Sequence, residues 1–197
     1  SLSGELLSEF LNGHRKQIMA ISISKDSSIL VSGGKDSTIV IWDLITGKIV
    51  RTLNYHKGIV TSLKLSPDGE YLISGGADKK ACLYNLKKNE LVWECADHNS
   101  DITAVAFSQD SKLFATGGGD QWIYIYSIDQ KKLIAKSQEH INWVRDIAFS
   151  KDGRKLISCG DDSRTVIRSM NQSGEITFTD IEQNLKGWIL SIDVNQD

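Results

Sequence analysis

The chain has 197 residues, with 23 Lys or Arg against 25 Asp or Glu, and its formal net charge at pH 7 is −2. The charges are interspersed and no apolar run reaches the ~20 residues of a membrane-spanning helix, so the sequence predicts no nucleic-acid partner and no membrane partner. The three cysteines, an odd number, argue against a disulfide framework, so we expect a cytoplasmic protein, with a nuclear location also open.

Short apolar runs with a period of two predict strands from residue 18 onward. In the first unit we expect strands over 18–23, 29–32, 38–42 and 48–53, separated by turns at 24–27, 33–36 and 46–47. Turn residues such as Gly, Asp and Ser separate the runs throughout. Since no stretch carries a helical apolar stripe longer than a turn or two, the sequence predicts an all-β protein.

A repeat of 42 residues organises these strands. The four histidines of the chain, His14, His56, His98 and His140, follow one another at this interval. Four turn aspartates and four hydroxyl residues keep the same interval: Asp36, Asp78, Asp120 and Asp162; Ser32, Ser74, Thr116 and Ser158. A period of about 40–45 residues is typical of the four-stranded blades of a β-propeller.

Two dipeptides identify the repeat more closely. Gly13-His14 followed by Trp42-Asp43 resembles the signature of the WD40 family, and the resemblance extends from residue 3 to residue 195. It implies a WD40-type β-propeller. It also implies a buried hydrogen-bonded set in each blade, made of the loop histidine, the hydroxyl, the turn aspartate and, in the first blade, Trp42.

Later repeats depart from this signature. The WD dipeptide becomes Tyr84-Asn85, then Tyr126-Ser127, then Arg168-Ser169. A tyrosine keeps a polar tip on an aromatic body, so a modified network is expected there. Arg168 brings a charge in place of an indole, and we expect it either to pair with an acid or to extend outward, leaving its blade locally looser.

The register divides the chain into four complete four-stranded blades with one orphan strand at each end. Blades are expected at 14–55, 56–97, 98–139 and 140–184, after the last strand of a preceding blade in 1–13 and before the first strand of a following blade in 185–197. The orphan strands fall at 5–11 and 187–194. A ring of seven blades would need roughly 290 residues, so we expect part of a seven-bladed ring; a ring made of two or more chains is the alternative.

The sequence offers little for catalysis. Cys95 stands near His98, but the histidine is a repeat position and the cysteine aligns with other residue types elsewhere. Histidines on four different blades lie too far apart to share a metal ion, and the glycine pairs precede no helix that would cradle a phosphate. We therefore expect no enzyme, no cofactor and no metal.

The positions that differ between repeats predict the binding face. In the WD40 family, the residues three and five after each histidine, and the residue before each turn aspartate, face the top of the propeller. These candidates for partner binding are Gln17, Met19, Lys35, Ile59, Thr61, Ala77, Asp101, Thr103, Gly119, Trp143, Arg145 and Asp161, continued by Trp188 and Leu190.

Aromatic and arginine residues stand out among these candidates. Trp143, Arg145 and Trp188 form the strongest expected cluster because Trp and Arg are enriched at binding hot spots. Packing of Trp143 against another blade is the competing interpretation. Trp122 is a second candidate for an exposed anchor and Trp93 a weaker third, which could simply cover an edge.

Two functions follow from this face. The first is a non-catalytic interaction platform that binds protein or peptide partners, within a multiprotein complex. The alternative is a sensor or regulatory domain of a larger multidomain signalling protein whose catalytic part is absent from this sequence.

Overall fold

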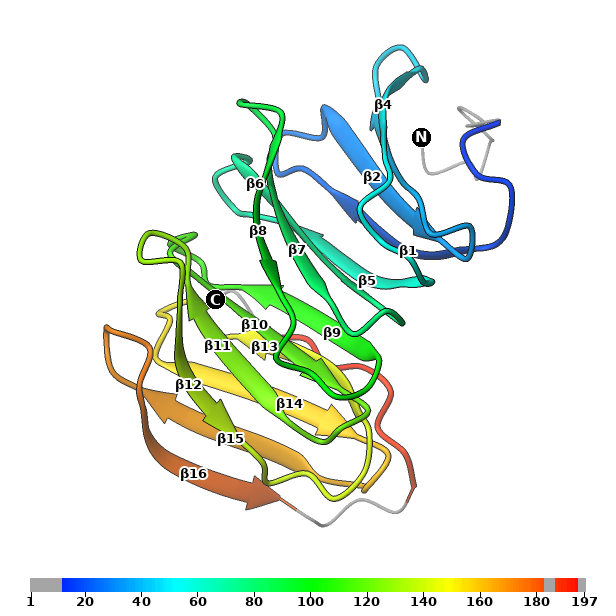
Figure 1. Ribbon diagram of the computed structural model, residues 1–197. Helices are drawn as coiled ribbons and strands as arrows, with labels where there is room; N and C mark the ends of the chain where they lie inside the picture. The colour runs from blue at the N-terminus through cyan, green and yellow to red at the C-terminus, as the bar shows by residue number, and fades with distance from the viewer. Residues whose placement is uncertain (1–11, 183–186, 195–197) are drawn as a thin grey trace, which may run out of the picture.

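The fold, given by a computed structural model that describes residues 12–182 and 187–194, is entirely built of strands. In this part of the chain sixteen strands form four antiparallel sheets of four, and in each sheet the strands lie side by side in chain order. The four sheets follow one another in a row, with the first and the last at opposite ends of the molecule (Figure 1). This is the architecture of an open, partial propeller, and each sheet is one blade.

The bounds of the strands follow the repeat. Blade 1 holds β1 (Ile18–Ile23), β2 (Ile29–Gly34), β3 (Ile39–Asp43) and β4 (Ile49–Leu53). Blade 2 holds β5 (Val60–Leu65), β6 (Tyr71–Gly76), β7 (Ala81–Asn85) and β8 (Glu90–Cys95). Blade 3 holds β9 (Ile102–Phe107), β10 (Leu113–Gly118), β11 (Ile123–Ser127) and β12 (Lys132–Ser137). Blade 4 holds β13 (Val144–Phe149), β14 (Lys155–Gly160), β15 (Thr165–Met170) and β16 (Ile176–Glu182).

The second strand of the first blade runs further than the sequence predicts, because its glycines belong to the sheet. Gly33 pairs with both Ala20 and Ile39 in neighbouring strands. A Cβ atom at Gly33 would lie 2.5 Å from the Val60 side chain of blade 2. Glycine at this position therefore lets two blades approach closely, and the turn begins only after Gly34.

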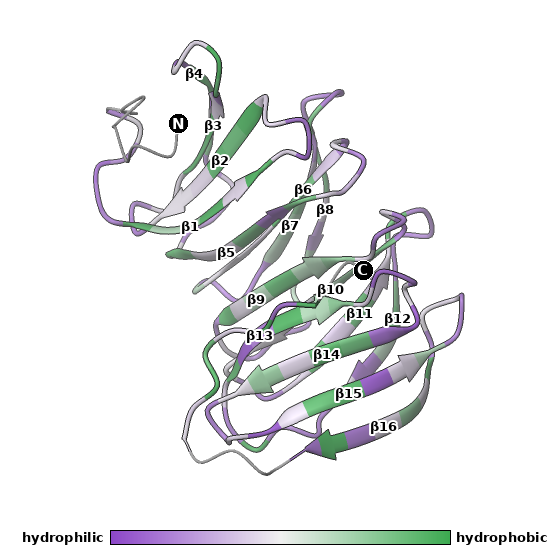
Figure 2. Cartoon of the chain, turned by 180° about the vertical axis from the view of Figure 1, so that it is seen from behind, coloured by the Kyte–Doolittle hydropathy of each residue, from purple (hydrophilic) through white to green (hydrophobic). Residues whose placement is uncertain are grey.

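The apolar core lies between successive blades. Buried residues of blades 1 and 2 form one cluster, those of blades 2 and 3 a second, and those of blades 3 and 4 a third. The first strands β1, β5, β9 and β13 are neighbours along the row, and hydrophobic residues follow the strands of all four sheets (Figure 2). Each blade is thus stabilised by the sheets beside it, as in other repeat folds.

One predicted terminal strand is not formed. Residues 187–194 have no strand structure, although Ile189 donates its N–H to the Gly160 carbonyl (3.2 Å) and Ile192 donates its N–H to Asp146 (3.0 Å). The segment therefore lies alongside blade 4 without pairing as a sheet strand, because the described residues contain no second strand of its own blade. The strand predicted over 5–11 lies outside the described residues.

The structure contains no candidate for a transmembrane helix: none of the described residues belong to a helix of the length and apolarity that crossing a bilayer requires.

Candidate functional site

A hydrogen-bonded histidine fixes the loop that enters each blade. In blade 1, Nε2 of His14 lies 2.8 Å from the Ser32 hydroxyl, and Nδ1 lies 3.0 Å from the Asp36 carboxylate. Asp36 also accepts the N–H of Arg15 at 2.7 Å. The same two histidine contacts recur, at 2.8 Å to the hydroxyl and 2.9–3.0 Å to the carboxylate, in His56/Ser74/Asp78, His98/Thr116/Asp120 and His140/Ser158/Asp162.

One order of protons gives every group in this set a partner. The indole Nε1–H of Trp42 donates to Ser32 (2.8 Å), so the serine proton is free to donate to Nε2 of His14. Nδ1–H then donates to Asp36. This order requires a neutral imidazole and an ionised carboxylate.

The carboxylates of these sets are held in the ionised form. Burial alone raises the pKa of Asp36, Asp78 and Asp120, but hydrogen bonds from backbone N–H groups and from the histidine outweigh it, and each pKa lies below its usual value. In blade 4 burial is the largest influence on His140 and lowers its pKa, against the attraction of Asp162. In blade 4 the net effect therefore favours the neutral form of His140.

Arg168 takes the place of the indole in blade 4. Its Nη1 donates to Ser158 at 2.7 Å, the bond that Trp42 makes to Ser32 in blade 1. The guanidinium is fully buried and pairs with Glu139 at 2.7 Å. Of the two expectations, pairing with an acid is the one realised, and the hydrogen-bonded set of blade 4 is complete rather than loosened.

A second position, which the sequence reasoning missed, varies together with the WD position. The residue before each histidine touches the residue found 29 positions later. A Cβ atom at Gly13 would lie 2.1 Å from the Trp42 ring, so that pair combines the smallest residue with the largest. The other pairs are an aromatic contact between Tyr55 and Tyr84, a 3.0 Å hydrogen bond from Tyr126 to Asp97, and the ion pair of Arg168 with Glu139.

The candidates for partner binding meet at the end of the blades that carries the histidine loops. In every blade, the residue before the turn aspartate donates its N–H to the carbonyl of the residue three after the histidine, at 2.8–3.0 Å. These backbone pairs are Lys35 with Gln17, Ala77 with Ile59, Gly119 with Asp101, and Asp161 with Trp143. The structure thus brings two of the three predicted positions together in each blade.

Two of the candidates already use their hydroxyl groups within the protein. The Thr61 hydroxyl lies within hydrogen-bonding distance of the Gly75 and Ile102 carbonyls. The Thr103 hydroxyl lies within hydrogen-bonding distance of the Gly117 and Val144 carbonyls. One carbonyl of each pair belongs to the next blade. These threonines hold neighbouring blades together.

Trp143, Arg145 and Asp161 form one compact group. Arg145 donates to both carboxylate oxygens of Asp161, from Nε at 2.7 Å and from Nη2. Its guanidinium carbon lies 5.1 Å from the centre of the Trp143 ring. The indole covers Gly119 of blade 3, where a Cβ atom would lie 2.9 Å from the ring. Trp143 is therefore half-buried: one side packs on the preceding blade while the residue remains partly accessible.

Other candidates flank this group with exposed side chains. Trp188 is 71% and Leu190 65% exposed, and the intervening Ile189 is bonded to Gly160, next to Asp161 in the chain. Gln17 and Met19 of blade 1 are exposed. Lys35 of blade 1, Ile59 of blade 2 and Asp101 of blade 3 are half-buried.

The two other tryptophan candidates are packed more than the sequence suggests. Trp122 is half-buried, with the Lys136 ammonium 5.1 Å from its ring centre. Trp93 lies edge-on against Phe114 and Tyr126 of blade 3. It packs between two blades and is not an exposed anchor.

The residues that could carry other chemistry are dispersed or inert. Among residues 12–182 and 187–194, no three His, Cys, Asp or Glu side chains are placed to share a metal ion. All three cysteines are buried and free of disulfides. Burial raises the pKa of Cys82 and Cys159 to about 12, which leaves the unreactive thiol form at neutral pH.

Comparison with known sequences identifies the repeat. A family profile described as WD domain, G-beta repeat matches residues 4–43, 47–85, 89–127 and 131–167. The protein is 44% identical over 43 residues to small ribosomal subunit protein RACK1y of Oryza sativa subsp. japonica, a match that covers 22% of this chain and 13% of the relative.

Two further comparisons agree with this result. Eukaryotic translation initiation factor 3 subunit I of Bombyx mori is 45% identical over 53 residues, which is 27% of this chain and 16% of the relative. A solved structure titled "Structure of U3-55K" superposes with a TM-score of 0.81 at 17% identity, covering 91% of this chain and 55% of that one. The chain therefore spans about half the length of that structure, and each curated match involves a small part of the relative.

Proposed function

The chain belongs to the WD40-repeat family, and on this premise we propose that it is a non-catalytic platform that binds a protein or peptide partner on its top face. Proteins of this family typically serve as interaction scaffolds. The top face is the end of the blades that carries the histidine loops and the turns between second and third strands. The group of Trp143, Arg145 and Asp161 is the proposed centre of the binding site.

One observation carries this proposal: the group is held in place before any partner arrives. Asp161 fixes the Arg145 guanidinium through two hydrogen bonds, and Trp143 packs against both Arg145 and Gly119. A binding residue that is already ordered loses little conformational entropy on association. Half-buried Trp and Arg with an apolar neighbour such as Trp188 make the composition of an interface centre.

The setting we propose is a multiprotein complex in a reducing compartment, such as the cytoplasm or the nucleus. The names of two matched relatives describe components of larger assemblies, the small ribosomal subunit and initiation factor 3. Three free, buried cysteines suit a reducing environment.

The double variant Trp143→Ala, Arg145→Glu tests the face. We expect partner binding to weaken by about 30-fold or more, which corresponds to the roughly 2 kcal/mol that defines a hot spot. The measurement is quantitative capture of partners from native lysate, followed by titration of the strongest one against the wild type and the variant.

The matched control is Arg51→Glu, a charge reversal on the exposed outer strand β4. It should leave the partner set unchanged, and circular dichroism should show the same fold for all three proteins. An unchanged affinity in the double variant would move the binding site away from the top face.

A further inference from the structure

The edge of the blades opposite the top face is not uniform, and a serine bridges one of its junctions. At this edge lie the turns that join first to second strands. Between blades 2 and 3 the two turns touch, because the Asp68 N–H donates to the Ser111 hydroxyl at 3.2 Å and Ser111 is buried. The residues equivalent to Ser111 in blades 2 and 4 are Gly69 and Gly153, and a Cβ atom at either would meet nothing within 4 Å.

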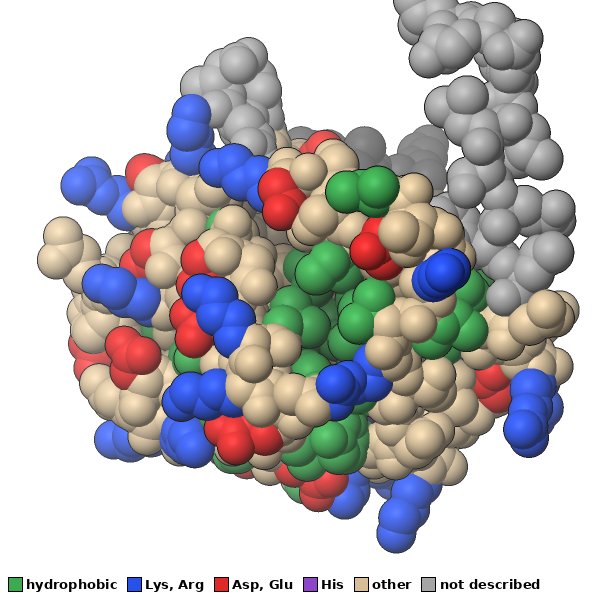
Figure 3. Space-filling model, turned by 90° about the horizontal axis from the view of Figure 1, so that it is seen from above, with side chains coloured by type: hydrophobic (Ala, Val, Ile, Leu, Met, Phe, Trp, Pro, Cys, Tyr) green, Lys and Arg blue, Asp and Glu red, His purple; other side chains and the backbone are tan. Residues whose placement is uncertain are grey.

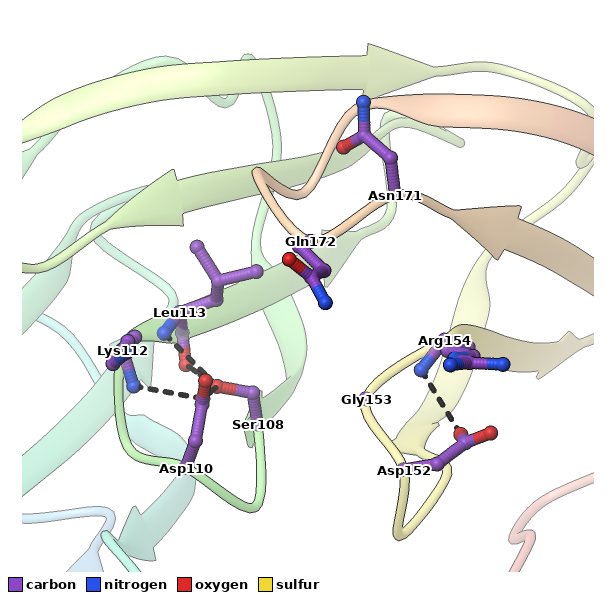
Figure 4. Close-up of a pocket in the computed structure, with 9 residues that line it drawn as sticks. All are labelled: Ser108, Asp110, Lys112, Leu113, Asp152, Gly153, Arg154, Asn171 and Gln172. Atoms are coloured by element: carbon purple, nitrogen blue, oxygen red, sulfur yellow. Dashed lines mark hydrogen bonds between the residues drawn. The ribbon is translucent and has the colours of Figure 1, made fainter.

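Grooves lie at the two junctions that have glycine. The larger has a volume of about 640 Å³ and runs between blades 3 and 4, beside Gly153 (Figure 4). The smaller, of about 360 Å³, lies between blades 1 and 2, beside Gly69. A volume of several hundred Å³ is in the range of ordinary ligand pockets.

The larger groove carries one cation on each side. Lys112 of blade 3 and Arg154 of blade 4 occupy the same repeat position, which is Ser28 in blade 1 and Glu70 in blade 2. Both cations are exposed. Within the described residues, neither has a carboxylate oxygen within 4.0 Å of its charged nitrogen atoms, the distance that defines an ion pair.

The acids beside these cations are already engaged within their turns. Asp110 accepts hydrogen bonds from the Ser108 hydroxyl at 2.7 Å and from the Lys112 N–H at 3.1 Å. Asp152 accepts from the Ser150 hydroxyl at 2.6 Å and from the Arg154 N–H at 3.0 Å. Each aspartate shapes its turn through Oδ1, whereas the exposed side chains of Lys112 and Arg154 form no ion pair within the described residues.

A third turn closes one side of the groove and supplies an amide. Asn171 accepts the N–H groups of Ser173 and Glu175, each at 3.0 Å, and a Cβ atom at Gly174 would lie 2.9 Å from Leu113. The turn is therefore fixed against blade 3, and it carries the exposed Gln172 into the space between the two aspartate turns (Figure 4). A glutamine side chain both donates and accepts, which suits contact with a peptide backbone.

We propose that the groove between blades 3 and 4 binds an extended, acidic peptide segment of a partner protein. Carboxylates of the segment pair with Lys112 and Arg154 on the two sides, the guanidinium offering a two-point contact. Gln172 contacts the backbone of the segment, and Leu113 gives the groove an apolar wall. This surface is separate from the top face, so a partner held here leaves the other surface available.

The equivalent residues of the repeat itself supply the variants that test this site. Ser27 and Ser111 both adopt φ of 57°, close to the 68° of Gly153 and the 70° of Gly69. Gly153→Ser should therefore be accommodated by the turn, and its hydroxyl should close the larger groove as Ser111 closes its own junction. Gly69→Ser is the matched control, because it closes the smaller groove only.

Binding is measured with the whole chain and a fluorescein-labelled peptide of alternating Glu and Leu, by fluorescence anisotropy at two salt concentrations. We expect Arg154→Glu and Lys112→Glu each to weaken binding about fivefold, the loss of one exposed ion pair. Gly153→Ser should weaken it comparably, while Gly69→Ser and the top-face double variant should bind as the wild type does.

Three results would overturn the proposal. The first is no measurable binding of the acidic peptide to the folded wild-type chain. The second is equal weakening by Gly153→Ser and Gly69→Ser. The third is binding of a Lys-Leu peptide or a single-stranded oligonucleotide as tight as that of the acidic peptide, which would indicate no preference or another class of partner. Circular dichroism of each variant separates a local loss of binding from unfolding.

Discussion

His140 illustrates how one residue of the repeat is tuned by its surroundings. The side chains of His140 and Asp162 are both fully buried, and the imidazole faces Asp162, Arg168 and Glu139. Burial, the largest influence, lowers the pKa of His140 below 6.5 even though both acids raise it. The folded protein therefore prefers the neutral imidazole that the hydrogen-bonded set requires.

This preference makes stability depend on pH. Below about pH 6.5 His140 takes up a proton in the unfolded chain more readily than in the folded one, so the unfolded state is favoured as the pH falls. We expect the melting temperature to decline from pH 6.5 downward, and the decline to be shallower in His140→Gln, which keeps an amide in place of the imidazole but cannot titrate. Thermal unfolding followed by circular dichroism from pH 8 to pH 5 measures both slopes. Equal slopes for wild type and variant would contradict the role given to this histidine.

At the scale of the blade, the pairs formed before each histidine explain why the repeat tolerates Trp, Tyr or Arg at the WD position. Two of these pairs supply a hydrogen bond to the equivalent serine of their blade by different means. Trp42, beside Gly13, donates to Ser32, and Arg168, paired with Glu139, donates to Ser158. The indole delivers a neutral N–H and needs empty space beside it. The guanidinium delivers a charged N–H and needs a carboxylate there, because an unpaired buried charge is strongly unfavourable.

A double-mutant cycle in blade 4 tests this interdependence. Glu139→Gly should lower the free energy of unfolding by about 2–3 kcal/mol, because it leaves the fully buried Arg168 without its countercharge. Arg168→Trp alone should also destabilise, since the indole would meet the Glu139 side chain. The pair of substitutions Glu139→Gly and Arg168→Trp, which copies blade 1, should recover part of that loss.

Urea unfolding at neutral pH measures the cycle. A coupling free energy well above the 0.3–0.5 kcal/mol scatter of independent sites would support the pairing. Additive effects would show that the two positions act separately.

At the scale of the whole molecule, blade 1 exposes a surface that is buried in every other blade. Ile21 is 60% exposed, while its equivalents Leu63, Val105 and Ile147 are 1–3% exposed because the preceding blade covers them. Ile23 beside it is 54% exposed. Seen from above, hydrophobic side chains gather in the middle of this end of the molecule with charged ones around them (Figure 3). An apolar patch of this kind promotes association.

We therefore expect residues 1–197, as an isolated chain, to associate with increasing concentration. Size-exclusion chromatography with light scattering should show the apparent mass rising with loading. Ile21→Lys should shift the chain toward the monomer by placing a charge on the patch. Ile45→Lys is the matched control, because Ile45 is 85% exposed but belongs to the turn between β3 and β4 and not to β1. A wild-type chain that stays monomeric at high concentration would contradict this expectation.

The sequence by itself determined the β class through its period-two apolar runs, the four-stranded unit through the interval of 42 residues, and the family through Gly13-His14 and Trp42-Asp43. A fold made of similar units repeats its structural residues at a fixed distance. The register of the repeat also predicted which positions meet at the histidine end of each blade, where the residue before the turn aspartate bonds to the residue three after the histidine. For these backbone pairs the sequence suffices, since both partners lie within one blade and their register is set by short, adjacent strands.

Only the tertiary structure decided what depends on contact between distant side chains. It showed that Arg168 replaces an indole by pairing with Glu139, that Trp93 fills a space between blades, that Thr61 and Thr103 bridge blades, and that residues 187–194 form no strand. It also showed that Ser111 bridges the turns at one junction, whereas a groove lies beside Gly153 at another. A repeat pattern shows which residue occupies each position of the unit. These outcomes depend instead on which side chain of a neighbouring blade or loop contacts that residue in the folded protein.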